Sequence, residues 1–274
     1  MLIKSYSKLN LSLRILKKQK NGLHDISSDN CLISLHDKIY IKKISSNKDK
    51  ILFKGPFKKN IKLSSNSVQQ TLNLLRKIGK VKNRYSIIVN KQVPVFSGLG
   101  GGTSNSAYLL KYFYKNKVSK EIQSIFEKKI GTDLKLFFYK QSFLKNLKTI
   151  KKIRLKYNLN FVLIYPYLKC STKEIYLKFR KKKSYNPKIK NSNNLIEKIA
   201  NKKNDLENIV VQKYPVIKKI ILTLKNQKGC HFSRITGSGS ACFGVFQSKK
   251  LAKEAQKNIK LKFPSFFCVL TKTI

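Results

Sequence analysis

A cluster of glycines at positions 98, 100, 101 and 102 constrains this chain more than any other feature. The cluster lies in the stretch PVFSGLGGGTSNSA at 94–107, between an alternating apolar segment at 85–89 and a long apolar segment from Ser104. Glycine permits positive φ and leaves no Cβ between the backbone amides and an approaching anion. A helix that follows such a loop adds unpaired N–H groups and the positive end of its dipole. The sequence therefore predicts a strand, an anion-binding loop and a helix, and favours a nucleotide triphosphate as the ligand.

The loop differs from the two commonest nucleotide-binding loops. Thr103 stands where the GxxxxGK[ST] pattern requires lysine, and the GxGxxG spacing of dinucleotide folds is absent. A turn without a ligand is the alternative, but the polar side chains at the start of the helix favour phosphate binding. The predicted phosphate-binding residues are Pro94, Val95, Phe96, Ser97, Gly98, Leu99, Gly100, Gly101, Gly102, Thr103 and Ser104.

The charge of the chain favours an anionic partner without defining one. Its 274 residues include 60 Lys and Arg against 12 Asp and Glu, which gives a formal net charge of +48. Nucleic-acid-binding proteins usually gather such charge on one face or interleave it with aromatic residues. Here lysines occur along every segment, so we interpret the charge as a compositional bias and expect no specific nucleic-acid partner. A basic nucleic-acid-binding protein is the alternative.

Neither the cysteines nor the apolar runs indicate a secreted or membrane protein. The five cysteines are widely spaced and include no CxxC pair, so we expect neither a disulfide framework nor a zinc site. The start of the chain, MLIKSYSKLNLSLRI, alternates polar and apolar residues instead of forming a signal peptide, and no apolar run is long enough to span a membrane. We expect a cytoplasmic protein with no membrane partner. The sequence does not define its oligomeric state.

Hydrophobic periodicity divides the chain into two α+β halves. Leu9, Leu11, Leu13 and Ile15 alternate with polar residues as in a half-buried strand, whereas helical spacing appears in 64–78. Strands are predicted at 9–15, 33–44, 50–53, 85–89, 161–165, 242–246 and 266–270. Helices are predicted at 64–78, 104–114, 119–131 and 216–224, and a surface loop at 180–194. A domain boundary is expected between residues 150 and 160.

Several segments taken together resemble the GHMP kinase superfamily. They are SKLNLSL at 7–13 with NGLH at 21–24, the glycine loop, IGTDLKLFF at 130–138, YPYLKCSTKEIY at 165–176, NDLEN at 204–208 and RITGSGSACFGVF at 234–246. They follow the order of the family and cover essentially the whole chain. KLNL followed by GxH is similar to the branch that phosphorylates a cytidine diphosphate ester. Kinases of the homoserine or mevalonate type are the alternatives.

The resemblance implies a fold and a reaction. The fold class would be α+β, a two-domain GHMP kinase architecture. It would contain a ribosomal-protein-S5-domain-2-like α/β domain at 1–153, which binds ATP, and a ferredoxin-like α+β domain at 154–274. The reaction would transfer the γ-phosphoryl of ATP to the 2-hydroxyl of 4-diphosphocytidyl-2-C-methyl-D-erythritol, in the non-mevalonate route to isoprenoid precursors. ATP would be the co-substrate and Mg²⁺ would enter with it, without a protein metal site.

The resemblance also implies a catalytic pair. Asp133 matches the family's catalytic aspartate, which would accept the proton of the attacking hydroxyl. Lys8 matches the lysine that would hold Asp133 ionised and stabilise the transferring phosphoryl. Considered without the family, Asp133 follows Gly131 at the end of a predicted helix, a position more typical of a turn or cap residue than of a catalytic base.

Further positions match the substrate side of the family. Asn10, His24 and Tyr176 are implied to bind the substrate, with the histidine hydrogen-bonded to cytosine and the tyrosine stacked on its ring. Gly237, Ser238 and Gly239 form a second glycine turn near the substrate phosphates, for which a plain hairpin is the alternative.

The chain departs from the family pattern at two places. Leu23 stands where the family usually has a tyrosine, so stacking on the cytosine would be one-sided. Phe96 and Ser97 replace a further glycine pair, so we expect the first turn of the glycine loop to be stiffer.

Overall fold

The structure is a computed structural model that describes residues 1–19, 22–61, 65–153, 157–179 and 195–274. Within these ranges the chain divides into two units. The first unit consists of Met1–Lys8, Leu32–Val95 and Gly100–Lys140, and the second of Leu9–Cys31, Phe96–Leu99 and Gln141–Ile274. A single boundary at residue 153 does not describe these units, because residues 9–31 and 96–99 belong to the second. The division into family domains at 1–153 and 154–274 stays a prediction.

The first unit contains a mixed sheet. Strand β5 (Arg84–Asn90) pairs antiparallel with the second half of β3 (His24–Ile44), and parallel with β4 (Lys50–Lys54). Strand β1 (Leu2–Asn10) also pairs with β3. The strands predicted at 33–44, 50–53 and 85–89 are therefore confirmed, although β3 begins earlier, at His24.

Capping side chains set the starts of two helices in the first unit. The Asn66 side chain accepts a hydrogen bond from Gln69 N at the start of α1 (Ser67–Lys77). Ser119 does the same for Ile122 N at α3 (Lys120–Ile130), which ends before Gly131 as predicted. The other helical segments are α2 (Gly101–Phe113) and the 3₁₀ segments η1 (Lys58–Asn60) and η2 (Thr132–Phe138).

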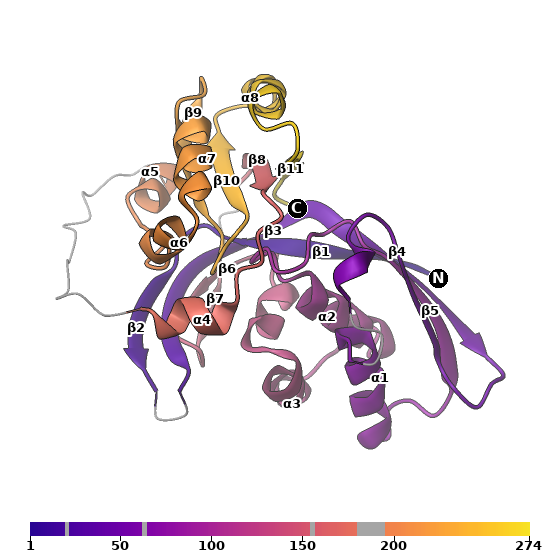
Figure 1. The fold of residues 1–274 in the computed structure, drawn as a ribbon. Helices are drawn as coiled ribbons and strands as arrows, with labels where there is room; N and C mark the ends of the chain where they lie inside the picture. The colour runs from indigo at the N-terminus through magenta and orange to yellow at the C-terminus, as the bar shows by residue number, and fades with distance from the viewer. Residues whose placement is uncertain (20–21, 62–64, 154–156, 180–194) are drawn as a thin grey trace. The chain divides into compact units, whose positions relative to one another are not determined.

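The second unit contains a four-stranded antiparallel sheet in the order β11-β8-β10-β9. Its strands are β8 (Asn160–Tyr165), β9 (Cys230–Ile235), β10 (Cys242–Phe246) and β11 (Phe267–Lys272). Helices separate β8 from β9 and β10 from β11, which gives the β-α-β-β-α-β connectivity of a ferredoxin-like fold (Figure 1). This confirms the predicted C-terminal fold.

Among the described residues, five helices and three short strands complete the second unit. The helices are α4 (Thr172–Leu177), α5 (Leu195–Ala200), α6 (Glu207–Lys213), α7 (Pro215–Lys225) and α8 (Lys249–Lys262). The strands are β2 (Arg14–Lys18), β6 (Gln141–Leu144) and β7 (Ile150–Lys152). The strand predicted at 9–15 is wrong as one element, because the chain leaves β1 at Asn10 and β2 starts at Arg14.

Two further predictions concern segments outside the sheets. The predicted surface loop at 180–194 lies outside the described residues. None of the described helices combines the length and the hydropathy needed to cross a bilayer. The cytoplasmic location expected from the sequence stays a prediction.

Candidate active site

The second half of the glycine loop forms the start of α2 in the first unit. Gly100 is the N-cap residue, with φ of 69° in the left-handed region. A Cβ on Gly100 would lie 2.9 Å from Phe137 Cζ and 3.4 Å from Lys8 Cε, so only glycine fits here. The N–H groups of Gly101, Gly102 and Thr103 in the first turn of α2 have no intrahelical acceptor, whereas Ser104 N donates to Gly100 O at 2.8 Å. This end of the loop has the donors that an anion requires.

The two predicted catalytic residues form an ion pair in the first unit. Lys8 Nζ lies 3.2 Å from Asp133 Oδ2. The Lys8 side chain is 4% exposed, whereas Asp133 is 37% exposed. Lys8 comes from β1 and Asp133 from the first turn of η2. A carboxylate that reaches solvent beside a buried ammonium remains able to accept a proton from a ligand hydroxyl.

A buried ion pair that the sequence analysis missed lies beneath the start of α2. Lys91 Nζ pairs with Asp37 Oδ2, and both side chains are almost completely buried. The other oxygen, Asp37 Oδ1, accepts hydrogen bonds from Gln92 N at 2.8 Å and Val93 N at 2.9 Å. A Cβ on Gly101 would lie 3.2 Å from Lys91 Nζ, so the ammonium lies directly against the loop. The sequence did not predict a role for Lys91, because nothing in its pattern distinguishes it from the other basic residues, 60 in all.

Ser104, predicted to bind phosphate, uses its hydroxyl inside the protein. Ser104 Oγ donates to Tyr6 O at 2.6 Å and lies 2.7 Å from Ser5 Oγ, and the residue is fully buried. The Ser104 side chain therefore attaches α2 to β1, and Ser104 N donates to Gly100 O at 2.8 Å. Its contact with phosphate stays a prediction.

The segment that carries Asp133 is held by Lys111 of α2. Lys111 Nζ donates to Phe137 O at 2.6 Å, near the C-terminal end of η2. The ammonium also lies over the Tyr108 ring, 4.4 Å from its centroid. Burial lowers the pKa of Lys111 to about 8.

We expect Lys111 to give the folded protein a distinct pH dependence. Because its folded pKa of about 8 lies below the unfolded value, its contribution to stability is lost as pH falls through 8. Between about pH 8 and pH 10, wild-type unfolding free energy should rise relative to Lys111→Met by on the order of 1–3 kcal/mol. Urea denaturation of both proteins at several pH values measures this difference. A constant difference across the range would contradict the assignment.

The first half of the glycine loop, Phe96–Leu99, belongs to the second unit. Gly98 has φ of 79°, and a Cβ there would collide with Thr236 O. Ala241 N donates to Ser97 O at 3.2 Å, so this part of the loop packs on the second glycine turn. Phe96 has φ of 56°, in the left-handed region that favours glycine. Phe96, one of the two residues that replace the family's glycine pair, therefore has a strained backbone conformation.

A pocket of about 370 Å³ lies beside this part of the loop in the second unit. It is lined by Phe96, Gly98, Lys169, Cys170, Ser171, Thr172 and Ser238. Thr172 Oγ1 and Ser238 Oγ lie 3.0 Å apart, and Lys169 supplies a cation. The pocket is lined by predicted binding residues from both glycine turns, Phe96 and Gly98 from the first and Ser238 from the second. Lys169 and Thr172 belong to the motif YPYLKCSTKEIY, in which the sequence analysis gave a site role to Tyr176 but to neither of these two residues.

The second glycine turn connects β9 to β10, so the hairpin alternative correctly describes its topology. Gly237 and Gly239 have φ of 57° and 79°, and Gly239 N donates to Thr236 O at 3.0 Å. Among the described residues, the N–H groups of Gly237, Ser238 and Ser240 have no hydrogen-bond partner. Successive N–H groups in such a turn form a concave anion site.

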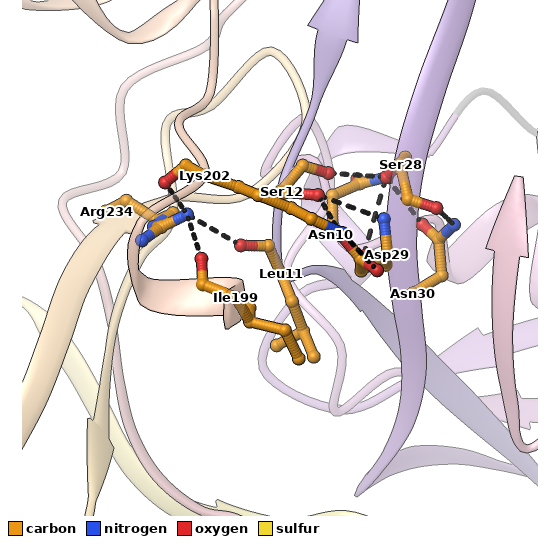
Figure 2. Close-up of polar contacts among 9 residues, drawn as sticks. All are labelled: Asn10, Leu11, Ser12, Ser28, Asp29, Asn30, Ile199, Lys202 and Arg234. Atoms are coloured by element: carbon orange, nitrogen blue, oxygen red, sulfur yellow. Dashed lines mark hydrogen bonds and ion pairs between the residues drawn. The ribbon is translucent and has the colours of Figure 1, made fainter. Parts of the chain in front are cut away.

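Asn10 lies against this turn within the second unit. Asn10 N donates to Thr236 Oγ1 at 3.0 Å, and a Cβ on Gly237 would lie 3.2 Å from Asn10 Oδ1. The Asn10 amide nitrogen donates to Ser28 Oγ at 3.0 Å and Asn30 Oδ1 at 2.7 Å (Figure 2). These two bonds fix the amide orientation of Asn10.

His24 and Tyr176 form a ring pair in the second unit. Their centroids are 5.3 Å apart with planes inclined at 35°, and Phe179 lies edge-on to His24. Burial, followed by the charge of Lys18, lowers the pKa of His24. The imidazole is therefore neutral near pH 7, with one donor and one acceptor nitrogen. Leu23 beside it is 44% exposed.

Helix α4 links these groups. Thr172, its first residue, contacts Ser238, and Tyr176 one turn later contacts His24. The structure thus gathers the predicted substrate-side residues around α4 and the second glycine turn. It places Lys8, Asp133 and residues 100–104 in the first unit.

Comparisons with known proteins agree with these features. The family described as GHMP kinases C terminal matches residues 186–265. A 4-diphosphocytidyl-2-C-methyl-D-erythritol kinase of Pelagibacter ubique (strain HTCC1062) is 36% identical over 282 residues, covering 99% of this chain and 98% of that protein. Among solved structures, a 4-(cytidine 5'-diphospho)-2C-methyl-D-erythritol kinase has a TM-score of 0.74 at 20% identity, covering 99% of both chains. A homoserine kinase from Cytophaga hutchinsonii has a TM-score of 0.73 at 14% identity, covering 100% of this chain and 95% of the other.

The fold, the glycine-rich helix start and these matches define a GHMP kinase. The similarity to solved structures shows the fold. The sequence relatives identify the family within that fold, since they match over nearly the whole chain. The chain belongs to the family of 4-diphosphocytidyl-2-C-methyl-D-erythritol kinases.

Proposed function

We propose that the chain transfers the γ-phosphoryl group of ATP to the 2-hydroxyl of 4-diphosphocytidyl-2-C-methyl-D-erythritol. The observation that supports this most strongly is the Lys8–Asp133 ion pair, in which Lys8 also lies against Gly100 at the start of α2. Phosphoryl transfer depends mainly on positioning and on stabilisation of charge. Asp133 as a base, Lys8 as a cation and the N-terminus of α2 together meet those requirements.

In this proposal the first unit performs the chemistry. Asp133 Oδ accepts the proton of the attacking hydroxyl, which raises the nucleophilicity of its oxygen. Lys8 holds Asp133 in place through their ion pair and stabilises negative charge on the transferring phosphoryl. The N–H groups at the start of α2 bind phosphate oxygens of ATP, and the buried Lys91–Asp37 pair presents its ammonium side to the same loop.

The second unit recognises the cytidine diphosphate ester. Tyr176 stacks on the cytosine, and neutral His24 hydrogen-bonds its polar edge. The N–H groups of the second glycine turn bind phosphate oxygens of the ester. Asn10 contacts the substrate beside that turn. The excess of positive charge attracts both anionic substrates, in a manner that salt weakens.

Mg²⁺ would enter with the nucleotide. Mg²⁺ is usually held by one or two carboxylates together with substrate phosphates. Across the described parts of the chain, no three His, Cys, Asp or Glu side chains gather into a metal site. Asp133 is a carboxylate close to the helix that would hold the phosphates, so the residues fit a metal held mostly by ATP itself.

A substrate panel tests the proposed specificity. Formation of ADP is measured with 4-diphosphocytidyl-2-C-methyl-D-erythritol, mevalonate and homoserine, each with ATP and Mg²⁺. We expect turnover with the cytidine ester alone. Turnover confined to mevalonate or homoserine would contradict the proposed substrate. Absence of turnover with all three, together with tight RNA binding, would favour a basic nucleic-acid-binding protein.

Leu23→Tyr should strengthen binding of the cytidine ester. A second aromatic ring beside His24 and Tyr176 would complete the stack on the cytosine, and such contacts typically contribute about 1–3 kcal/mol. We expect KM for the ester to fall about fivefold or more, with KM for ATP unchanged. The control is Leu261→Tyr, which alters another exposed leucine, on α8. An unchanged KM in Leu23→Tyr would show that Leu23 does not border the cytosine.

A further inference from the structure

The motif NDLEN lies in a segment, residues 199–208, that is firmly attached to the rest of the second unit. The buried guanidinium of Arg234 donates to the carbonyl oxygens of Lys202 at 2.7 Å and Leu11 at 3.0 Å, and more weakly to Ile199 O at 3.4 Å (Figure 2). It also donates to Ala200 O at 3.1 Å. One cation thereby fixes the end of α5 against the residues that follow β1.

A second set of contacts holds the same segment. Lys202 Nζ lies 2.7 Å from Asp29 Oδ2 and 3.0 Å from Asp29 Oδ1 (Figure 2). Leu13 N donates to Lys203 O at 3.0 Å, and Asp205 N donates to Leu13 O at 2.8 Å. The backbone on both sides of Asn204 is therefore fixed.

From this position Asn204 reaches the second glycine turn. Asn204 Nδ2 donates to Gly237 O at 2.8 Å and to Ile235 O at 3.2 Å, while Oδ1 accepts from Leu206 N at 3.0 Å. Carbonyl oxygens can only accept and a backbone N–H can only donate, so the amide has one possible orientation. Asn204 is 5% exposed, which makes the loss of these partners costly.

The contact with Gly237 O sets the direction of a neighbouring donor. In a trans peptide, the carbonyl of one residue and the N–H of the next lie in one plane and point in opposite directions. Holding Gly237 O toward Asn204 therefore points Ser238 N–H away from it. That N–H has no partner among the described residues, and Ser238 lines the pocket beside Gly98.

We propose that Asn204 is a positioning residue, which aims the Ser238 N–H at an anionic oxygen of the substrate. This rests on the proposed function, in which the second glycine turn contacts the cytidine diphosphate ester. Asn204 does not touch the substrate in this account. It acts by fixing the Gly237–Ser238 peptide plane, so its effect should appear in binding of the ester and be absent from binding of ATP.

Calorimetric titration of the full chain tests the proposal. Asn204→Ala and the milder Asn204→Ser are each titrated with 4-diphosphocytidyl-2-C-methyl-D-erythritol and, separately, with a non-hydrolysable ATP analogue. Ser248→Ala is the control for general destabilisation, because Ser248 caps α8 through Leu251 N and takes no part in the turn. Melting temperatures are recorded for all variants.

We expect Kd for the ester to rise about fivefold to fiftyfold in Asn204→Ala, which corresponds to a misdirected hydrogen bond to a charged group. Kd for the ATP analogue should stay within about twofold of wild type. Ser248→Ala should lower the melting temperature without changing either Kd. If both Asn204 variants fail to fold, or lower the melting temperature without changing Kd for the ester, Asn204 is structural and the proposal is wrong. Failure of the wild type to bind the ester would instead contradict the proposed function.

Discussion

Asp133→Asn should lower kcat by about 10²–10⁴-fold, the usual contribution of a general base. The amide keeps the shape of the carboxylate but cannot accept the proton of the attacking hydroxyl. ATP binding should change by less than about twofold, since the phosphates are assigned to the start of α2 and to Lys8. Steady-state kinetics together with titration of a non-hydrolysable ATP analogue measures both quantities.

The matched control for this variant is Glu121→Gln. Glu121 is an exposed acid in the first turn of α3, in the same unit, and takes no part in the proposed chemistry. Its kcat should equal that of the wild type. If Asp133→Asn retained full activity, Asp133 would not be the base. If it failed to fold, the Lys8–Asp133 pair would be structural.

Gly100→Ala should cause the second largest loss. The new Cβ would lie 2.9 Å from Phe137 Cζ and 3.4 Å from Lys8 Cε, at φ of 69°. The start of α2 must shift to relieve this contact, and Phe137 and Lys8 must shift with it. We expect kcat/KM for ATP to fall at least tenfold and the unfolding free energy to fall by about 1–3 kcal/mol, the usual range for backbone strain.

Gly79→Ala separates backbone strain from the steric effect. Gly79 has φ of 70° in the same unit, but a Cβ there would meet nothing within 4 Å. This variant should lose about 1 kcal/mol of stability, as a non-glycine residue does in the left-handed region, and keep its kinetics for ATP. Equal kinetic losses in Gly79→Ala and Gly100→Ala would show that the close approach at Gly100 is unimportant.

The sequence predicted the elements whose periodicity is strong. The alternation around Ile87 and Val89 and the capped helix after Ser119 both reappear in the structure, because local patterning decides them. Helix α8 was missed, since its buried face is built from Ala252, Ala255 and Ile259, and alanine gives a weak hydrophobic signal. The break between β1 and β2 was missed because distant partners cause it, as when Lys203 O accepts from Leu13 N.

The sequence predicted those residues of the candidate site that belong to family motifs. It did not predict the residues that belong to no motif. The pairing of Lys8 with Asp133 followed from the family pattern, because neither residue stands out by composition. Lys91 and Asp37 lie on segments distant in sequence and carry no motif, so their pairing required the structure. Asn204 lay within the quoted segment NDLEN, but its contact with Gly237 O depends on packing that sequence spacing does not encode.

The position of the transferred phosphoryl group tests the central claim most directly. The wild-type chain is incubated with ATP, Mg²⁺ and 4-diphosphocytidyl-2-C-methyl-D-erythritol, and the product is examined by ³¹P and ¹³C NMR. The account predicts one new phosphomonoester, on the 2-oxygen of the methylerythritol unit, formed in equal amount with ADP. Phosphate on another hydroxyl, or ADP and free phosphate without a phosphorylated ester, would contradict it.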